Sequence, residues 1–248
     1  VKGNLLEKYQ QIEKTIVKEA DYITGTSFSM HELLEDFDKS KYRTITNGYD
    51  AEDFENVEVK KEDEKFIVFH AGLLNEFRNP EGLWQALSNL SDSSEFANKI
   101  KIVLAGTIDE DLIAQIKNHP NLKENIEVLG YISHTEVIKW YMKSAVNLLL
   151  VNNSENAKVN IPGKLFELLA AQKPILAFGR DGCDAGKIVD STNSGLTLSY
   201  KSSVNNIEKA LRKMFKNPDY FRSLNYEKYE RKQLAREYLR IIYEEKTL

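Results

Sequence analysis

Two kinds of hydrophobic pattern alternate along most of the chain. Six short runs rich in Val, Ile, Leu and Phe are typical of buried strands, and the stretches between them repeat their apolar residues every three or four positions, as helices do. The runs are KFIVFHAG (65–72), KIKIVLAG (99–106), NIEVLG (125–130), AVNLLLV (145–151), KPILAFG (173–179) and SGLTLSY (194–200). Strands that alternate with helices predict βαβ units. We therefore expect residues 49–218 to form a doubly wound, Rossmann-like α/β domain, with a parallel sheet and helices on both faces.

The two ends of the chain lie outside this alternation. Apolar residues of 5–17 form one stripe at helical spacing, and two short strands are expected at 21–24 and 43–46. Because the chain starts at Val1 inside the first helix, we expect residues 1–48 to be the tail of another domain that is mostly missing. A helical piece is expected around residues 30–37, a turn at Asn47–Gly48 and a charged linker at 55–65. Two helices are expected within 204–248, and the C-terminal one, at 219–248, is expected to pack back on the missing domain.

The composition narrows the class of protein. The 248 residues carry 34 Lys and Arg against 38 Asp and Glu, a formal net charge of −4 that gives no sign of a nucleic-acid-binding surface. A single cysteine, Cys183, excludes an intramolecular disulfide framework and fits a reducing compartment. No apolar run reaches the ~20 residues that a membrane-spanning helix needs, and no signal peptide is visible. We therefore expect a cytoplasmic protein.

A candidate anion site lies in NIPGKLFELLAAQ (160–172), where Gly163 and Lys164 precede a predicted helix. The unpaired N–H groups of a helix N-terminus and its partial positive charge suit a phosphate. A cation at this position interacts unfavourably with the helix dipole, at a cost of roughly 0.3–1 kcal/mol. An anionic ligand would explain why a lysine stands there. Glu167 lies on the same face and could accept hydrogen bonds from ribose hydroxyls. The alternative is a surface ion pair between Lys164 and Glu167.

Arg78 has a similar position on the expected sheet. It precedes Asn79, a candidate N-cap, and Pro80 at the start of another predicted helix, and an Arg side chain matches phosphate bidentately. Its alternative is a solvated loop arginine. Ligands of open parallel sheets bind beyond the carboxyl ends of the strands, so Arg78 and Lys164 are expected at the same edge.

Four further features have weaker claims to a function. The glycine-rich loop GRDGCDAGK (179–187) either cradles a phosphate or simply connects a strand to a helix, and Cys183 within it lacks a paired histidine. Residues 109–111 read D-x-D, a pattern of metal-dependent sugar transferases, but acids in a first helical turn are favourable without a metal. The four histidines show no metal-ligand spacing. His134 looks like a helix start, and His70 ends a strand where it could face the crevice.

Taken in order, several of these segments resemble one protein family. They are ITNGYDAEDF (45–54), the loop from Gly72 to Arg78-Asn-Pro, NIEVLGYI (125–132) and IPGKLFELLAAQKPILA (161–177). Over residues 20–200 the chain is similar to the C-terminal, donor-binding half of GT-B-fold glycosyltransferases, within the large retaining family that uses nucleotide sugars in bacterial polysaccharide and glycan assembly. The resemblance implies a sugar donor linked to UDP, GDP or ADP, a glycan or lipid-linked acceptor, and work in the cytoplasm or at the inner face of a membrane.

The resemblance also implies roles for individual residues. Arg78 and Lys164 would be catalytic, holding the pyrophosphate and stabilising the departing nucleotide by fixed positive charge, with no metal cofactor needed. Glu167 would hold the ribose. The backbone around Tyr131 and Ile132 would meet the base. The further substrate-binding positions are Gly72, Gly163 and Gly182.

Two positions depart from the family pattern. Val159 stands where the family often has a second Glu that contacts the donor sugar, with Glu155 four residues upstream, and Leu73 stands where an Arg often follows the first-loop glycine. The acceptor domain is almost absent, so this chain alone is expected to bind donor and to transfer sugar weakly or not at all. The rival interpretation is a non-catalytic α/β interaction or regulatory module, because one scaffold of this kind hosts many functions.

Overall fold

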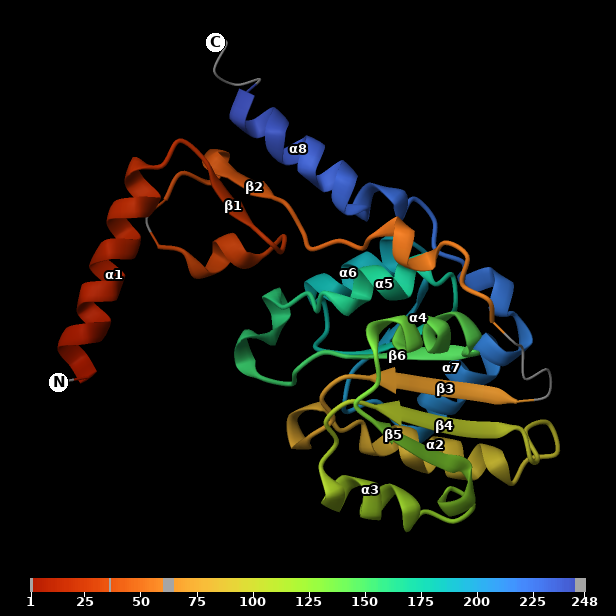
Figure 1. The fold of residues 1–248 in the computed structure, drawn as a ribbon. Helices are drawn as coiled ribbons and strands as arrows, with labels where there is room; N and C mark the ends of the chain where they lie inside the picture. Colours follow the sequence, from red (N-terminus) through yellow and green to blue (C-terminus); the bar gives the residue numbers. More distant parts are fainter. Residues whose placement is uncertain (1, 36, 60–64, 244–248) are drawn as a thin grey trace.

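A six-stranded parallel sheet forms the centre of the molecule (Figure 1). The computed structural model describes residues 2–35, 37–59 and 65–243. The strands follow the order β5-β4-β3-β6-β7-β8, which reverses between β3 and β6, as in doubly wound dinucleotide-binding folds. The strands are β3 (Phe66–Ala71), β4 (Ile100–Ala105), β5 (Ile126–Gly130), β6 (Val146–Leu150), β7 (Ile175–Phe178) and β8 (Gly195–Leu198).

Helices cover both faces of this sheet, as the sequence predicts. Successive side chains of a strand point to opposite faces, so Val68 of β3 joins one hydrophobic core while Ile67 and Phe69 join the other. The first core packs under α2 (Glu81–Ser91), α3 (Glu110–Lys117) and α7 (Val204–Lys216). The second packs under α4 (His134–Lys143), α5 (Lys164–Ala170) and α6 (Asp184–Ser191), which Figure 1 shows above the sheet. The expected Rossmann-like α/β class is confirmed.

Three helices of the sheet domain, α4, α6 and α7, begin at a residue whose side chain caps the helix. Ser133 and Glu136 form a complete capping box at the start of α4, which confirms His134 as the first helical residue. Asn79, in contrast, is not the N-cap of α2, and that prediction is wrong. Pro80 occupies the cap position, while the Asn79 side chain accepts a hydrogen bond from Trp84 Nε1 at 2.7 Å.

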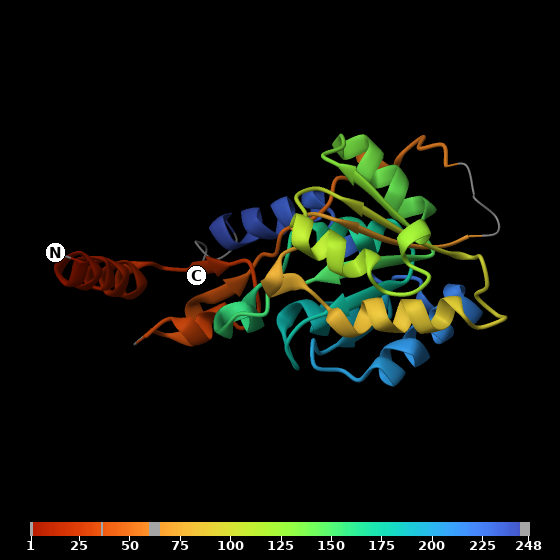
Figure 2. The same cartoon turned by 90° about the horizontal axis from the view of Figure 1, so that it is seen from below.

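The N-terminal segment forms a small unit of its own. α1 (Lys2–Glu19) leads into β1 (Ile23–Gly25), which pairs in parallel with β2 (Tyr42–Thr44). Figure 2 shows α1 projecting away from the sheet domain. Of the predicted apolar stripe only Val17 is buried, while the side chains of Leu5, Leu6, Tyr9, Ile12 and Ile16 are exposed. The expected helical piece is a short 3-10 turn, Met30–Leu33.

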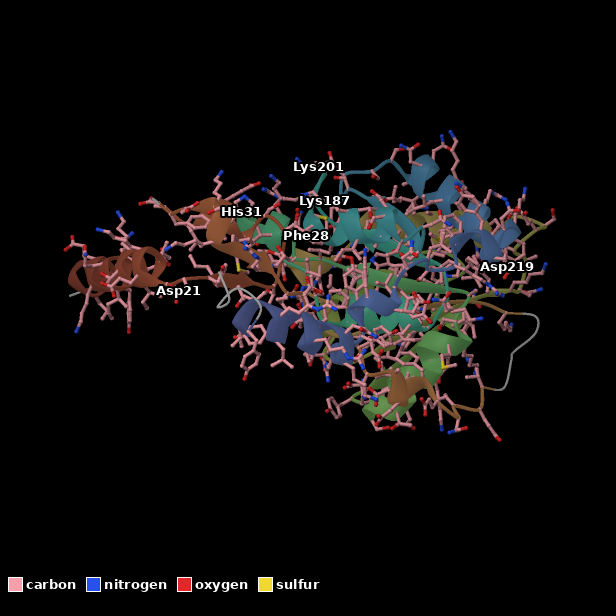
Figure 3. All side chains as sticks on the ribbon, turned by 90° about the horizontal axis from the view of Figure 1, so that it is seen from above. Asp21, Phe28, His31, Lys187, Lys201 and Asp219 are labelled. Atoms are coloured by element: carbon pink, nitrogen blue, oxygen red, sulfur yellow. The ribbon has the colours of Figure 1, made fainter. Side chains whose placement is uncertain are left out.

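Hydrogen bonds to a buried aspartate join this unit to the sheet domain. Asp184, the first residue of α6, is fully buried and accepts hydrogen bonds from the Ser29 N–H at 2.6 Å and the Ser29 hydroxyl at 2.8 Å. Lys187 Nζ lies 2.7 Å from the same carboxylate. Lys187 Nζ also lies 3.2 Å from the Ser29 hydroxyl, and Figure 3 labels Lys187 near Phe28, the residue that precedes Ser29. Burial raises the pKa of Asp184, but the hydrogen bonds from Lys187 and Ser29 outweigh it and leave that pKa below its usual value.

The C-terminal helix α8 (Arg231–Tyr243) returns toward the N-terminal side of the molecule (Figure 2). It begins at Arg231 rather than at 219, because two 3-10 turns precede it. Arg231 pairs with Asp50, and Lys232 Nζ lies 2.9 Å from Glu52 Oε1, so α8 is tied to the segment that leads into the sheet domain. Residues 60–64 of the expected charged linker lie outside the described residues. Within the described ranges, no helix is long and apolar enough to cross a membrane.

Candidate functional site

Three neighbouring strands end in glycines at the carboxyl edge of the sheet. Gly72, Gly106 and Gly130 follow or end β3, β4 and β5 and have φ values of 134°, 101° and 63°, which side chains disfavour. A Cβ on Gly106 would lie only 2.5 Å from the Gly72 carbonyl oxygen, so the backbones approach closely here. Gly72 itself is exposed. The edge next to the strand-order reversal is therefore open to a ligand, which is where this fold binds nucleotides.

Lys164 reaches this edge from the start of α5. Its Nζ donates a hydrogen bond to the Ala71 carbonyl at 2.9 Å and lies 3.3 Å from the position of a Cβ on Gly72. Burial, and next the positive charge of Arg78, lower the pKa of Lys164 to about 7, while Glu167 opposes the shift. The ammonium is thus held in a costly position without an anion. The predicted location of Lys164 at a helix start is confirmed.

Arg78 lies on the same edge, in the 3-10 turn Glu76–Arg78 after β3. It is half-buried, and its charge contributes to the lowered pKa of both Lys164 and His70. Burial raises the pKa of Tyr200, whose hydroxyl donates to the Val151 carbonyl at 2.8 Å, and the charge of Arg78 opposes that rise. The structure therefore brings the two predicted cations together from residues 86 positions apart (164 − 78).

His70 lies beneath these cations at the end of β3. It is fully buried, and its Nδ1 is 3.4 Å from the Leu148 carbonyl, while its Nε2 has no hydrogen-bond partner. Nε2 lies 3.9 Å from the position of a Gly72 Cβ. Burial, then the charges of Lys164 and Arg78, lower the pKa of His70 far below its usual range, so this imidazole is neutral. The sequence places His70 at a strand end but does not indicate its burial.

Glu167 is the third group of the site, one turn into α5. Its Oε1 lies 3.0 Å from Nε2 of His134, the first residue of α4, and its side chain is 22% exposed. Lys164 and Glu167 therefore turn their charged ends to different partners, although they are close enough for the Glu167 charge to raise the pKa of Lys164. The alternative, a simple surface ion pair between Lys164 and Glu167, does not describe this arrangement, because Lys164 bonds to the Ala71 carbonyl and Glu167 to His134.

The remaining predicted positions surround this edge with different degrees of exposure. The Tyr131 side chain is 95% exposed, whereas Ile132 is half-buried against the second core. Gly163 is exposed at the N-cap of α5, and Gly182 has a φ of 68° in the turn before α6, with open space around its Cβ position. No binding role of these residues is tested by the geometry alone, so the assignments stay predictions.

Other candidate groups have structural explanations. Cys183 is buried, caps α6 through its sulfur, and has a pKa raised chiefly by burial, so it is not an activated nucleophile. Asp109 precedes α3, and the two acids after it lie in the first turn of that helix, where they favour the helix dipole. Among the described residues, no group of three or more His, Cys, Asp and Glu side chains is placed to hold a metal ion.

The sheet edge can thus bind an anion beside a group that accepts hydrogen bonds. Residues 50–233 match the family model described as "Glycosyl transferases group 1", which covers most of the sheet domain and the start of α8. The chain belongs to the group 1 glycosyl transferases. No curated protein sequence shows significant similarity to it.

Solved structures share the fold of this glycosyltransferase chain at low sequence identity. A glycosyltransferase from Rickettsia africae ESF-5 aligns with 16% identity and a TM-score of 0.71, over 94% of this chain and 66% of the other. HepE from Anabaena, in complex with UDP, aligns with 12% identity and a TM-score of 0.70, over 94% and 67%. Sucrose-phosphate synthase from Thermosynechococcus elongatus aligns with 18% identity and a TM-score of 0.71, over 96% and 61%. The chain therefore spans 61–67% of the length of these proteins.

Proposed function

We propose that this chain is the donor-binding part of a glycosyltransferase that moves a sugar from a nucleotide-sugar donor to a glycan or lipid-linked acceptor in glycan assembly. The observation that carries the proposal is the pair of cations at the strand-order reversal, Lys164 beside exposed Gly72 and Arg78 in the turn that follows β3, whose charge acts on Lys164. Burial and the charge of Arg78 lower the pKa of Lys164 to about 7, so its charged form is held there at a cost. A diphosphate would reverse that cost, because it supplies the opposite charge.

In this proposal the two cations serve the leaving group. Breaking the bond between sugar and diphosphate places additional negative charge on the phosphate oxygen that departs. Fixed positive charge beside that oxygen stabilises the transition state more than the ground state. The residues supply this charge without a metal ion, and Glu167 offers a carboxylate for the ribose hydroxyls. Retention of stereochemistry and transfer of a hexose remain part of the proposal, on the strength of the family resemblance.

The acceptor site is proposed to lie largely outside this chain. HepE is described with UDP and, in another structure, with UDP-glucose, and this chain aligns with about two thirds of it. The exposed stripe of α1, which includes Leu5 and Ile12, and the exposed Leu239 and Tyr243 of α8 offer surfaces for a further domain. A cytoplasmic site of action, at the inner face of a membrane for a lipid-linked acceptor, belongs to the same proposal.

Thermal unfolding with UDP, GDP and ADP tests donor binding. A ligand at 100 times its dissociation constant stabilises a protein by about 2.7 kcal/mol, which is a shift of roughly 5–10 °C for a domain of this size. We expect one nucleotide to give this shift, Lys164→Ala to abolish it, and Lys117→Ala, at an exposed lysine on α3, to leave it unchanged. If none of the three nucleotides shifts the unfolding temperature of the folded protein, the non-catalytic module is the better account, which Val159 also favours.

A further inference from the structure

His134 links two carboxylates that come from separate elements. Its Nε2 lies 3.0 Å from Glu167 Oε1 in α5, and its Nδ1 lies 3.9 Å from Asp53 Oδ2 in the 3-10 turn Ala51–Phe54. The three residues are separated by 81 and 33 positions along the chain (134 − 53 and 167 − 134). Half of the His134 side chain is exposed, at 53%, so this histidine lies at the surface of the site and is not part of the hydrophobic core.

We infer that His134 is a positioning residue for Glu167, which it orients to bind the ribose of the donor; the inference rests on the proposed function. An imidazole N–H that donates to Oε1 uses one acceptor position of the carboxylate. The other oxygen, Oε2, remains available for the hydroxyls of a ribose. The hydrogen bond fixes the carboxylate before the ligand arrives, which removes part of the entropic cost of ordering it on binding.

The neighbouring cation Lys164 explains why the Glu167 carboxylate has to be oriented. Lys164 and Glu167 lie three positions apart in α5, on one helical face, and the Glu167 charge already acts on the pKa of Lys164. Without His134 the carboxylate would be free to turn toward the ammonium. That movement would take an acceptor from the ribose and would neutralise the cation proposed for the diphosphate. His134 therefore keeps the ribose-binding group and the phosphate-binding group apart.

The surrounding fold holds His134 from two sides. The Ser133–Glu136 capping box fixes the first turn of α4, and Ile138 one turn later is fully buried. On the other side, the turn that carries Asp53 is tied to α8 by the ion pairs Arg231–Asp50 and Lys232–Glu52. A cavity of about 480 Å³ separates this turn from the start of α4 and includes Asp53 and His134 in its lining. Movement of His134 into that space is opposed by its hydrogen bond to Glu167.

The test compares two ligands that differ only in the ribose. Calorimetry would measure the dissociation constants of UDP and of 2′,3′-dideoxy-UDP for the wild-type chain and for His134→Leu and His134→Gln. We expect His134→Leu to weaken UDP binding about three- to tenfold, the loss of one hydrogen bond, and to weaken dideoxy-UDP binding clearly less, because dideoxy-UDP has no ribose hydroxyls for Glu167 to bind. His134→Gln can place an amide N–H near the position of Nε2, so it should restore most of the UDP affinity.

Controls separate positioning from folding and from the proposed function itself. Thr135→Ala, at the exposed neighbouring position, should change neither affinity, and circular dichroism should show the same fold in every variant. Equal weakening of both ligands by His134→Leu, or no weakening of either, would overturn the inference while leaving donor binding intact. A folded wild-type chain that binds none of UDP, GDP and ADP would instead overturn the proposed donor site, and the role of His134 with it.

Discussion

The lowered pKa of Lys164 predicts that binding of a diphosphate takes up a proton. With a pKa of about 7, Lys164 carries about 0.5 of a proton at pH 7 and about 0.1 at pH 8. A bound diphosphate adds negative charge beside the ammonium and should raise its pKa back toward its ordinary value near 10.4. Binding should therefore take up about 0.5 of a proton at pH 7 and about 0.9 at pH 8. The measurement is best made at pH 8, because the terminal phosphate of the nucleotide is then fully ionised.

Calorimetry in buffers with different ionisation enthalpies measures this uptake directly. The apparent binding enthalpy of UDP should change with the buffer, with a slope close to one proton for wild-type protein at pH 8. Lys164→Arg is the matched control, since an arginine keeps the positive charge and does not deprotonate. That variant should bind UDP with no dependence of the enthalpy on the buffer. A slope near zero in the wild-type protein, or the same slope in Lys164→Arg, would refute the assignment of Lys164 to the diphosphate.

Three further predictions concern stability. Lys164→Met should stabilise the unliganded protein at pH 7 by about 1–2 kcal/mol, a discounted value because Lys164 is only half-buried. The stability of the wild-type protein should rise as the pH increases from about 7 to 10, because only the unfolded state keeps the proton in that range. Thermal unfolding at several pH values measures this rise, and a flat profile would show that the ammonium is not strained. Gly72→Ala should lower the free energy of unfolding by about 1–3 kcal/mol because of the φ of 134° at Gly72 and the contact with Lys164 Nζ. It should also weaken UDP binding more than Gly182→Ala, whose added Cβ meets no atom within 4 Å. Equal losses of stability and of UDP affinity in the two variants, measured by denaturant and UDP titrations, would argue against this role of Gly72. Asp184→Ala should lower the free energy of unfolding by about 2–4 kcal/mol and Ser29→Ala by about 1 kcal/mol, because only the first leaves a buried N–H unpaired. The stabilisation by Asp184 should be complete above about pH 4 and be lost as the pH falls through its lowered folded-state pKa. In urea unfolding, the difference in stability between Asp184→Ala and wild type should therefore be smaller at pH 3 than at pH 7.

The elements of the sheet domain could be predicted from sequence because their signals are local. The runs that form the central strands, such as β3 and β6, are almost wholly apolar, so burial on both faces of a parallel sheet follows from the pattern. The expected position of Arg78 and Lys164 on one edge also follows, because the carboxyl ends of parallel strands share an edge. The charge of Arg78 lowers the pKa of Lys164, which agrees with this placement.

The contacts that complete the site are not local, and no sequence signal identified them. His134 is separated from Glu167 by 33 residues (167 − 134), and its position at a helix start explains it without reference to Glu167. The error at Asn79 has a related cause. Its residue type favours an N-cap, but the indole N–H of Trp84, five residues further on, competes for the same side-chain oxygen. Side-chain competition of this kind depends on the packed helix and not on the preference of one residue.

A crystal structure of this chain with UDP would test the central claim most directly. We predict that the diphosphate lies beside Gly72 with its oxygens within hydrogen-bond distance of Lys164 Nζ and the Arg78 guanidinium, and that the ribose hydroxyls reach Glu167. A bound UDP located away from this edge, or one that leaves Lys164 hydrogen-bonded only to the Ala71 carbonyl, would contradict the account.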